Sequence, residues 1–272
     1  AVRRESPLIV GVGEGESFIA SDVPAILKYT KDYYLLEHDE IAVLDNSGVS
    51  VYDKHKQKIA KELKTADWDM DAAEKGGYEH FMLKEIHEQP SAVKTTITPR
   101  ITDGLPNLEE CGITPQKLKN FNQTNKDLVI IISQSGETAD SLAAMRLSKK
   151  LGAETLAIVN AKGSSIAREA DMLIYTHAGP EIAVASTKAY MVQIAVMYLI
   201  AFELALAVGA IDEKECRRLT RLLQEMPEYI AEILENKEDT QYIASSLITA
   251  DSLLYIGRGL DYALSMEGSL KL

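Results

Sequence analysis

The sequence predicts an α/β protein in which a parallel sheet is flanked by helices. A unit of strand, small polar loop and helix recurs from about residue 127 onward, and its strands are continuously apolar rather than alternating. The first 64 residues instead carry short β-strand patterns. Continuous apolar strands are typical of a sheet that is buried on both faces, which in a parallel sheet requires helices on each side.

The β-rich beginning of the chain consists of short apolar or alternating stretches separated by turns. We expect strands at residues 8–11, within residues 33–44, and at residues 48–53. The sequence Asn-Ser-Gly at 46–48 is a turn signal between two of these strands, so it predicts a hairpin.

A joint and a helix follow this region. Gly76 and Gly77 together mark a joint in the chain. The next stretch, "YEHFMLKEIHEQ", has apolar residues at helical spacing, and we expect Pro90 to stop or kink that helix. From there to about Asn125 the chain is polar and rich in turn residues.

The strand–loop–helix unit is predicted four times, at residues 127–153, 155–170, 172–200 and 252–272. A charged helical stretch at residues 213–237 separates the third unit from the fourth. The loop of each unit should lie at the carboxyl end of its strand, which is where open parallel sheets bind ligands.

Residues 189–210 are apolar over the length of a membrane span, but two polar side chains interrupt them. Gln193 and Glu203 are the interruptions, and a carboxylate in the middle of a span is costly in lipid. We therefore expect a buried core helix rather than a membrane span.

The charge and the cysteine content exclude several classes of function. The chain has 41 acidic and 29 basic side chains, a net charge of −12, which argues against nucleic-acid binding and against an anionic membrane surface. Cys111 and Cys216 form neither a disulfide framework nor a zinc spacing, and the histidines show no metal-binding pattern. We expect no metal, no other cofactor, no secretory signal and a cytoplasmic location.

The most informative loop is "SQSGET", which follows an apolar strand and opens a helix. Ser133, Ser135 and Thr138 supply hydroxyls, Gly136 lets the backbone approach a ligand closely, and the helix N-terminus favours an anion. No lysine follows as in a P-loop, so a monophosphate is a better match than a nucleotide triphosphate. The alternative is that Ser135 or Thr138 simply caps the helix.

Two further places carry candidate residues with ordinary alternatives. Ser186 and Thr187 lie near the start of the long apolar helix, where they either contact a ligand or belong to a capped helix with Lys188 in solvent. Glu267 and Lys271 are four residues apart on one helix, so they form either a surface ion pair or a proton-transfer lysine with a nearby carboxylate.

Five motifs in order give the chain a specific resemblance. "KGGYEHFMLKEIHEQP", "SQSGETADSL", "GSSIAREAD", "AGPEIAVASTKAY" and "GRG…EGSLKL" resemble the family of isomerizing glutamine–fructose-6-phosphate aminotransferases, also called glucosamine-6-phosphate synthases. The resemblance implies the C-terminal half of an Ntn-type glutaminase domain followed by flavodoxin-like SIS (sugar isomerase) domains.

The resemblance also implies a reaction and residue roles. Glutamine is hydrolysed, and its ammonia passes through a channel to aminate and isomerise fructose 6-phosphate to glucosamine 6-phosphate. The residues that match the family's sugar-phosphate loop are Ser133, Gln134, Ser135 and Thr138. Val184 and Ser186 match its contacts to the sugar, and Lys271 matches a lysine that assists proton transfer.

The sequence departs from the family at Ala183, Tyr190 and Ala263, and it lacks larger parts of the pattern. The family's nucleophilic cysteine would precede Ala1, and its catalytic glutamate, ring-opening histidine and second lysine would follow Leu272. A strand ending in a CGTS loop, the other half of the phosphate site, is missing between residues 120 and 121. We therefore expect these 272 residues alone to be inactive in the full reaction.

The resemblance predicts a domain division and partners. The glutaminase half covers residues 1–64, an interdomain linker 65–84, the first SIS domain without its first strand 85–235, and the start of a second SIS domain 236–272. Fructose 6-phosphate and glutamine are the implied substrates, with a homodimer, no nucleic acid and no membrane. The alternatives are a non-catalytic SIS sugar-phosphate-binding protein and a SIS isomerase or deaminase without glutaminase.

Overall fold

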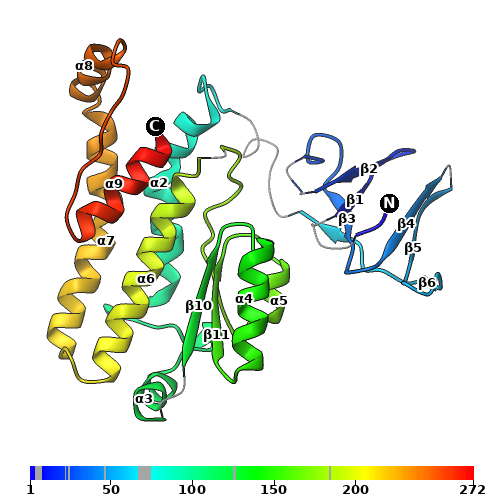
Figure 1. The fold of residues 1–272 in the computed structure, drawn as a ribbon, viewed down its shortest axis with the longest axis horizontal. Coiled ribbons are helices and arrows are strands. Elements are labelled where there is room, and N and C mark those ends of the chain that lie inside the picture. Colours follow the sequence, from blue (N-terminus) through cyan, green and yellow to red (C-terminus); the bar gives the residue numbers. More distant parts are fainter. Residues whose placement is uncertain are drawn as a thin grey trace.

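The computed structural model places the chain in a small β-rich unit and a larger α/β unit (Figure 1). It describes residues 1–3, 8–21, 23, 25–45, 47–66, 75–124, 127–183 and 185–272. The N-terminus lies in the β-rich unit and the C-terminus lies beside the long helices of the α/β unit.

The β-rich unit contains two small antiparallel sheets. One sheet has the order β2-β1-β3-β7 and the other β4-β5-β6. The expected strands are present, and β4 and β5 pair as a hairpin with Asp45 opposite Gly48; Asn46 of the expected turn lies outside the described residues. A small core of Val10, Leu36, Ala42 and Val51 joins the two sheets. The strands are β1 (Ile9–Val12), β2 (Ser17–Ala20), β3 (Asp32–Leu35), β4 (Ile41–Asp45), β5 (Gly48–Tyr52), β6 (Lys58–Ile59) and β7 (Lys64–Thr65).

The α/β unit is built around a parallel sheet with the order β10-β11-β12. Strand β11 alternates between the two faces of the sheet. Leu156 and Ile158 join a core cluster that includes residues of α6, whereas Ala157 and Val159 join a cluster with residues of α4 and α5. The expected parallel sheet with helices on each face is therefore confirmed. Its strands are β10 (Leu128–Ser133), β11 (Glu154–Val159) and β12 (Met172–Tyr175), and these helices are α4 (Ala139–Lys150), α5 (Ser165–Glu169) and α6 (Lys188–Ala207).

Helix α2 (Phe81–Ile97) continues through Pro90, so of the two expected effects of this proline, a stop or a kink, the stop does not occur. Proline removes one backbone hydrogen bond from a helix. Packing offsets that loss, because Val93 and Ile97 are buried in one cluster with Val192 and Leu199 of α6. Helix stability in proteins comes mainly from such burial.

Short elements connect α2 to the sheet where only a polar, turn-rich stretch was expected. A 3₁₀ turn and a small hairpin follow α2, and a second 3₁₀ turn leads into another helix. These elements are η1 (Thr98–Arg100), β8 (Ile101–Thr102), β9 (Leu105–Pro106), η2 (Glu109–Cys111) and α3 (Pro115–Thr124). Helix α3 runs across residues 120 and 121, and β10 is the edge strand of the sheet described above.

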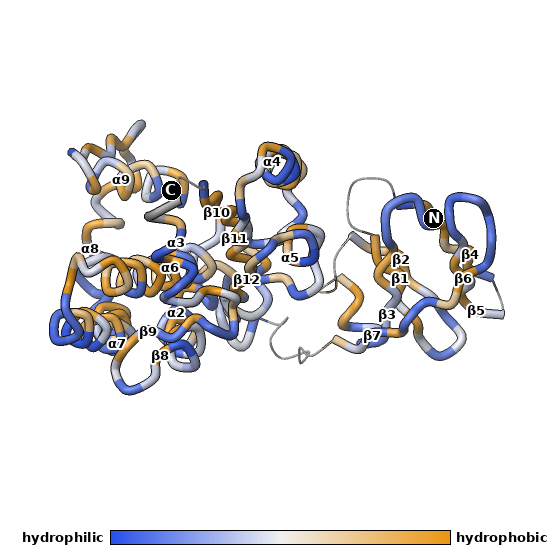
Figure 2. Tube along the Cα trace, turned by 90° about the horizontal axis from the view of Figure 1, so that it is seen from below, coloured by the Kyte–Doolittle hydropathy of each residue, from blue (hydrophilic) through white to orange (hydrophobic). Residues whose placement is uncertain are grey.

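Helix α6 has the length and apolar composition of a membrane span, and it is the one described helix that does. It packs against α2, α3 and α7 (Glu213–Glu235). Figure 2 shows the mainly hydrophobic residues of α6 among the other helices of the α/β unit. Glu203, near the C-terminal end of α6, is 4% exposed. Burial raises the pKa of the Glu203 carboxyl to about 7, and Glu109 adds to that rise. The expected core helix is present.

The fourth strand–loop–helix unit forms only in part. Helix α8 (Glu238–Leu247) precedes it and helix α9 (Leu260–Lys271) is present, but residues 252–257 form no strand, contrary to expectation. Leu254 and Ile256 are 89% and 88% exposed. A strand needs a neighbour to take its backbone hydrogen bonds, and no described strand lies beside this segment.

Candidate functional site

The loop of residues 133–138 lies at the carboxyl end of β10 and leads into α4. Gly136 has φ +65°, and its N–H donates to Ser133 Oγ at 3.0 Å. The hydroxyls of Ser133 and Thr138 lie 3.2 Å apart. The loop therefore folds back on itself and brings two of its hydroxyl groups together.

Helix capping does not account for all of these hydroxyls. Thr138 occupies the N-cap position of α4, yet its side chain makes no capping hydrogen bond. Ser135 Oγ accepts from Glu137 N at 3.2 Å, which is a local turn contact. The start of α4 thus lacks the side-chain cap that the simpler interpretation requires, and an anion is favoured at such a helix end.

The loop after β11 packs directly against the loop after β10. The carbonyl of Gln134 accepts from Asn160 N at 3.1 Å, and the carbonyl of Gly136 accepts from Ile166 N at 3.0 Å. Glu137 Oε1 accepts from Ser165 N at 2.9 Å. These bonds join two loops at one edge of the sheet, so each holds the other in position.

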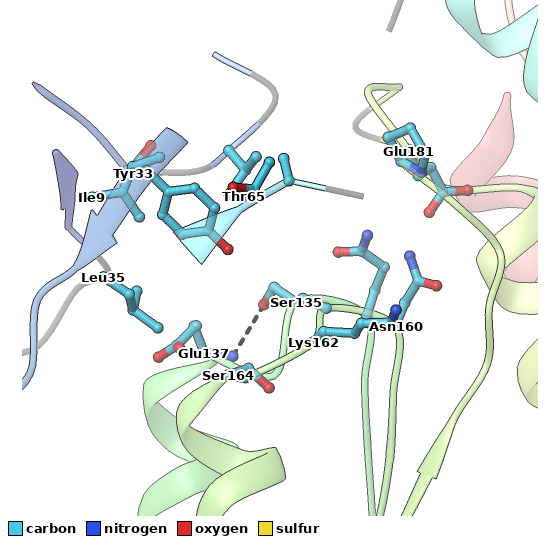
Figure 3. Close-up of a pocket in the computed structure, with 17 residues that line it drawn as sticks. Ile9, Tyr33, Leu35, Thr65, Ser135, Glu137, Asn160, Lys162, Ser164 and Glu181 are labelled. Carbon is cyan, nitrogen blue, oxygen red and sulfur yellow. Dashed lines mark hydrogen bonds between the residues drawn. The ribbon is translucent and has the colours of Figure 1, made fainter. Parts of the chain in front are cut away.

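A cavity of about 250 Å³ lies between this edge of the sheet and the β-rich unit (Figure 3). Tyr33 and Thr65 of the β-rich unit face Ser135 across it. Gln134 and Ser135 are the members of the expected set that line it. Its other lining residues are Ile9, Ser21, Val23, Leu35, Ala66, Glu137, Asn160, Ala161, Lys162, Gly163, Ser164, Pro180 and Glu181.

The second expected loop is held by a carboxylate. Glu181 Oε2 accepts from Ser186 Oγ at 2.8 Å, and its Oε1 accepts from Thr187 N at 2.8 Å. Ser186 has φ +48°, an uncommon conformation for a residue with a side chain. Val184, the other residue expected to contact the sugar, lies outside the described residues.

Lys188 is buried, so the interpretation that it lies in solvent was wrong. Its side chain is 4% exposed and its Nζ lies 2.6 Å from Glu88 Oε2 of α2. Nearby, Glu85 Oε1 accepts from the backbone amides of Ile182 and Ala183. Helix α2 therefore supplies the carboxylates that hold the loop and the start of α6, because burying an ammonium group requires a partner.

Lys271 on α9 reaches the same loop. Its Nζ lies 2.6 Å from Glu267 Oε1 and contacts the carbonyl of Ala185. It also lies 5.9 Å from the centre of the Tyr190 ring. Burial raises the pKa of Tyr190, and Glu267 raises it further. The Glu267–Lys271 ion pair is therefore present, and Lys271 also contacts Ala185, the neighbour of Ser186 in the chain.

Two cations, Arg100 and Lys162, act on His177, which follows β12 at this edge of the sheet. Burial lowers the pKa of His177, and Arg100 and Lys162 lower it further. Among the described residues no group of three or more His, Cys, Asp or Glu side chains could hold a metal ion. The chemistry available here is hydrogen bonding and charge, from hydroxyls, amides and a cation.

Sequence reasoning missed several residues that shape this edge. Glu137 lies inside the "SQSGET" motif itself, and Ser164 and Lys162 lie in the loop of the next strand–loop–helix unit. That repeated unit was the available signal, because loops at the carboxyl ends of adjacent parallel strands lie side by side. Glu181 lies inside the motif "AGPEIAVASTKAY", but no sequence signal assigned it a role.

The sheet, its helices and the paired loops lie in the part of the chain that is similar to a known domain family. Residues 118–202 match the family model described as the SIS domain. A solved structure titled C-terminal domain of glucosamine-fructose-6-phosphate aminotransferase, from Francisella tularensis, superposes with a TM-score of 0.66 and 28% identity, over 73% of this chain and 68% of that one.

All of this chain aligns with isomerizing glutamine–fructose-6-phosphate aminotransferases. The relatives from Caldanaerobacter subterraneus and Clostridium tetani are 43% and 45% identical over 316 aligned positions. The relative from Thermococcus kodakarensis is 39% identical over 311 positions. The resemblance to this family is therefore confirmed along the whole chain, which spans about half the length of these relatives.

Proposed function

We propose that this chain takes part in making glucosamine 6-phosphate from glutamine and fructose 6-phosphate, and that it carries a sugar-phosphate-binding part of the enzyme. The observation that supports this most directly is the hydroxyl-rich loop of residues 133–138 at the carboxyl edge of the sheet. The similarity to named aminotransferases over all of the chain supports the reaction.

The phosphate binds in this proposal at the loop after β10. Hydroxyls of Ser133, Ser135 and Thr138 donate to phosphate oxygens, with Gln134 beside them, and the uncapped start of α4 favours the negative charge. The absence of a P-loop lysine is consistent with a monophosphate, which needs no magnesium-bound triphosphate cradle.

The sugar and the proton-transfer step are assigned to the second loop. Val184 and Ser186 contact the sugar, and Lys271 moves a proton during amination. Support for this role of Lys271 comes from its contact with the carbonyl of Ala185 and its pairing with Glu267, which place its amino group beside the loop.

The proposal includes the domain division and the assembly. Residues 1–64 belong to a glutaminase domain, 65–84 link it to a first SIS domain at 85–235, and 236–272 begin a second SIS domain. The enzyme is a cytoplasmic homodimer that takes ammonia from glutamine. The small antiparallel sheets before residue 66 and the parallel sheet after residue 127 support separate units on either side of a linker.

Calorimetric titration with fructose 6-phosphate tests the binding role. We expect Ser133→Ala to weaken binding by about tenfold, which corresponds to the loss of one hydrogen bond to a charged group. Ser148→Ala is the matched control, because Ser148 lies on α4 away from the loop and its hydroxyl donates to the carbonyl of Ala144 in an exposed hydrogen bond. Equal affinities of the two variants, or no binding by the unsubstituted chain, would contradict the proposal.

The reaction is tested separately by following glucosamine 6-phosphate. A protein of the relatives' full length that contains this chain should form it from glutamine and fructose 6-phosphate, and Lys271→Met should lower kcat more than KM changes. Binding without any turnover by that protein would favour a non-catalytic sugar-phosphate-binding protein instead.

A further inference from the structure

Arg3 is a buried cation that the β-rich unit holds in place. The residue is 4% exposed, and its Nη1 donates to the carbonyl of Leu36 at 2.6 Å. Its backbone is also fixed, since Arg3 N donates to the carbonyl of Glu40 and Asp39 N donates to the carbonyl of Arg3. The direction of the guanidinium is therefore set by the β-rich unit.

The other end of this guanidinium reaches the phosphate loop of the α/β unit. Arg3 Nη2 lies 3.2 Å from Glu137 Oε2 and donates to Ser165 Oγ at 3.0 Å. The Glu137 carboxylate is only 12% exposed, and its second oxygen accepts from Ser165 N. One arginine thus joins a loop residue 134 positions away and the start of α5.

We propose that Arg3 is a positioning residue for the sugar-phosphate loop, so that docking of the β-rich unit sets the affinity of the loop for a sugar phosphate. This inference rests on the proposed function of the loop. Arg3 acts through Glu137, which follows Gly136 and precedes Thr138 in the loop itself, and it does not contact the ligand.

The physical reason is the cost of a buried carboxylate that has lost its partner. With Arg3 removed, the Glu137 carboxylate keeps its bond to Ser165 N but loses its cationic partner, and a nearly buried unpaired charge is strongly unfavourable. Glu137 would turn toward water, and the loop hydroxyls on either side of it would move with its backbone. A lysine in place of Arg3 could not replace this contact pattern, because it lacks the planar fork that serves Leu36, Glu137 and Ser165 together.

A second contact between the two units supplies a matched control. Arg168 of α5 pairs with Glu37 of the β-rich unit, but both side chains are about a third or more exposed. Exposed pairs of this kind contribute little. Arg168→Ala therefore removes an interunit ion pair without touching the loop of residues 133–138.

Calorimetric titration with fructose 6-phosphate measures the effect on affinity. We expect Arg3→Ala and Arg3→Lys each to raise Kd by about tenfold, a typical coupling between two sites, while Arg168→Ala leaves it within twofold. Val51→Ala provides a stability control, because Val51 is buried in the core of the β-rich unit. If Val51→Ala weakens binding as much as Arg3→Ala, the effect is general destabilisation and the inference is wrong.

Hydrogen exchange without ligand separates this inference from the proposed function. In Arg3→Ala the amides of Gly136 and Glu137 should exchange at least about tenfold faster, whereas those of β11 should not change. Faster loop exchange in a chain that binds no sugar phosphate would refute the proposed function but keep Arg3 as the residue that holds the loop. Unchanged exchange and unchanged Kd would overturn the role of Arg3.

Discussion

A methyl group added at Gly136 would collide with Ser164, so Gly136→Ala should disturb the loop of residues 133–138 and the fold together. A Cβ at this position would lie 2.0 Å from Ser164 Oγ and 2.6 Å from Ser164 Cβ. Real Cβ atoms essentially never approach other atoms so closely, and both loops are tied by the hydrogen bond from Ile166 N to the carbonyl of Gly136. One of the two loops must therefore move.

The magnitude has two parts. Gly136 has φ +65°, and an alanine in the left-handed region costs about 1–2 kcal/mol. Forcing the extra methyl group into a packed place adds about 1–3 kcal/mol. We therefore expect Gly136→Ala to lower the free energy of unfolding by about 2–5 kcal/mol.

Gly152→Ala is the matched control. Gly152 also has a positive φ, +92°, but a Cβ there would meet nothing within 4 Å. Only the conformational part should remain, about 1–2 kcal/mol. Urea denaturation followed by circular dichroism measures both losses, and the double variant Gly136→Ala with Ser164→Gly should recover most of the packing part. Equal losses at 136 and 152 would refute the argument from the close approach.

Three further changes test other parts of the structure. Burial raises the pKa of Glu203 from 4.5 to about 7, so its contribution to stability is present below pH 4.5 and is lost as the pH rises to about 7. Glu203→Gln should therefore remove a fall of about 3 kcal/mol in unfolding free energy across that range, measured by urea denaturation at several pH values; an unchanged slope would contradict it. Lys188→Met removes the 2.6 Å partner of Glu88, which keeps Lys84 at 3.6 Å, and should cost up to about 3 kcal/mol, against less than about 1 kcal/mol for Arg218→Ala on the surface; similar losses would argue against a stabilising role of the buried Lys188. Leu156→Ala removes a fully buried side chain of β11 and should lower the thermal midpoint through a loss of about 2–5 kcal/mol, whereas no change would show that β11 is not central to the core.

Much of the fold was predictable because its signals are local. The apolar runs at 128–133, 154–159 and 172–175 each specify a strand, and the helix after each run follows from its own composition. The predicted stop at Pro90 and the predicted strand at residues 252–257 are both absent, and the reason is the same. A proline is tolerated in a helix that packs on both α6 and α7, and an apolar run forms no strand without a neighbouring strand.

The candidate site was predictable only in its loops. Ser133, Ser135 and Thr138 were expected from a motif that needs no tertiary information. The partners of that motif were not expected, because Ser164 and Arg3 reach it from other loops and another unit. The buried state of Lys188 was also missed, since its partner Glu88 lies 100 positions earlier in the chain.

The sequence alone determined the order of strands and helices, the core nature of α6 and the hydroxyl-rich loop, because hydrophobic periodicity and loop composition are properties of neighbouring residues. Only the tertiary structure decided which charges are buried, that Glu137 is held by Arg3, and that Gly136 must be glycine because Ser164 packs against it. Ion pairs and close contacts of this kind depend on distances between segments that are far apart in the chain. Those distances are set by the packing of the two units and by no local pattern of residues.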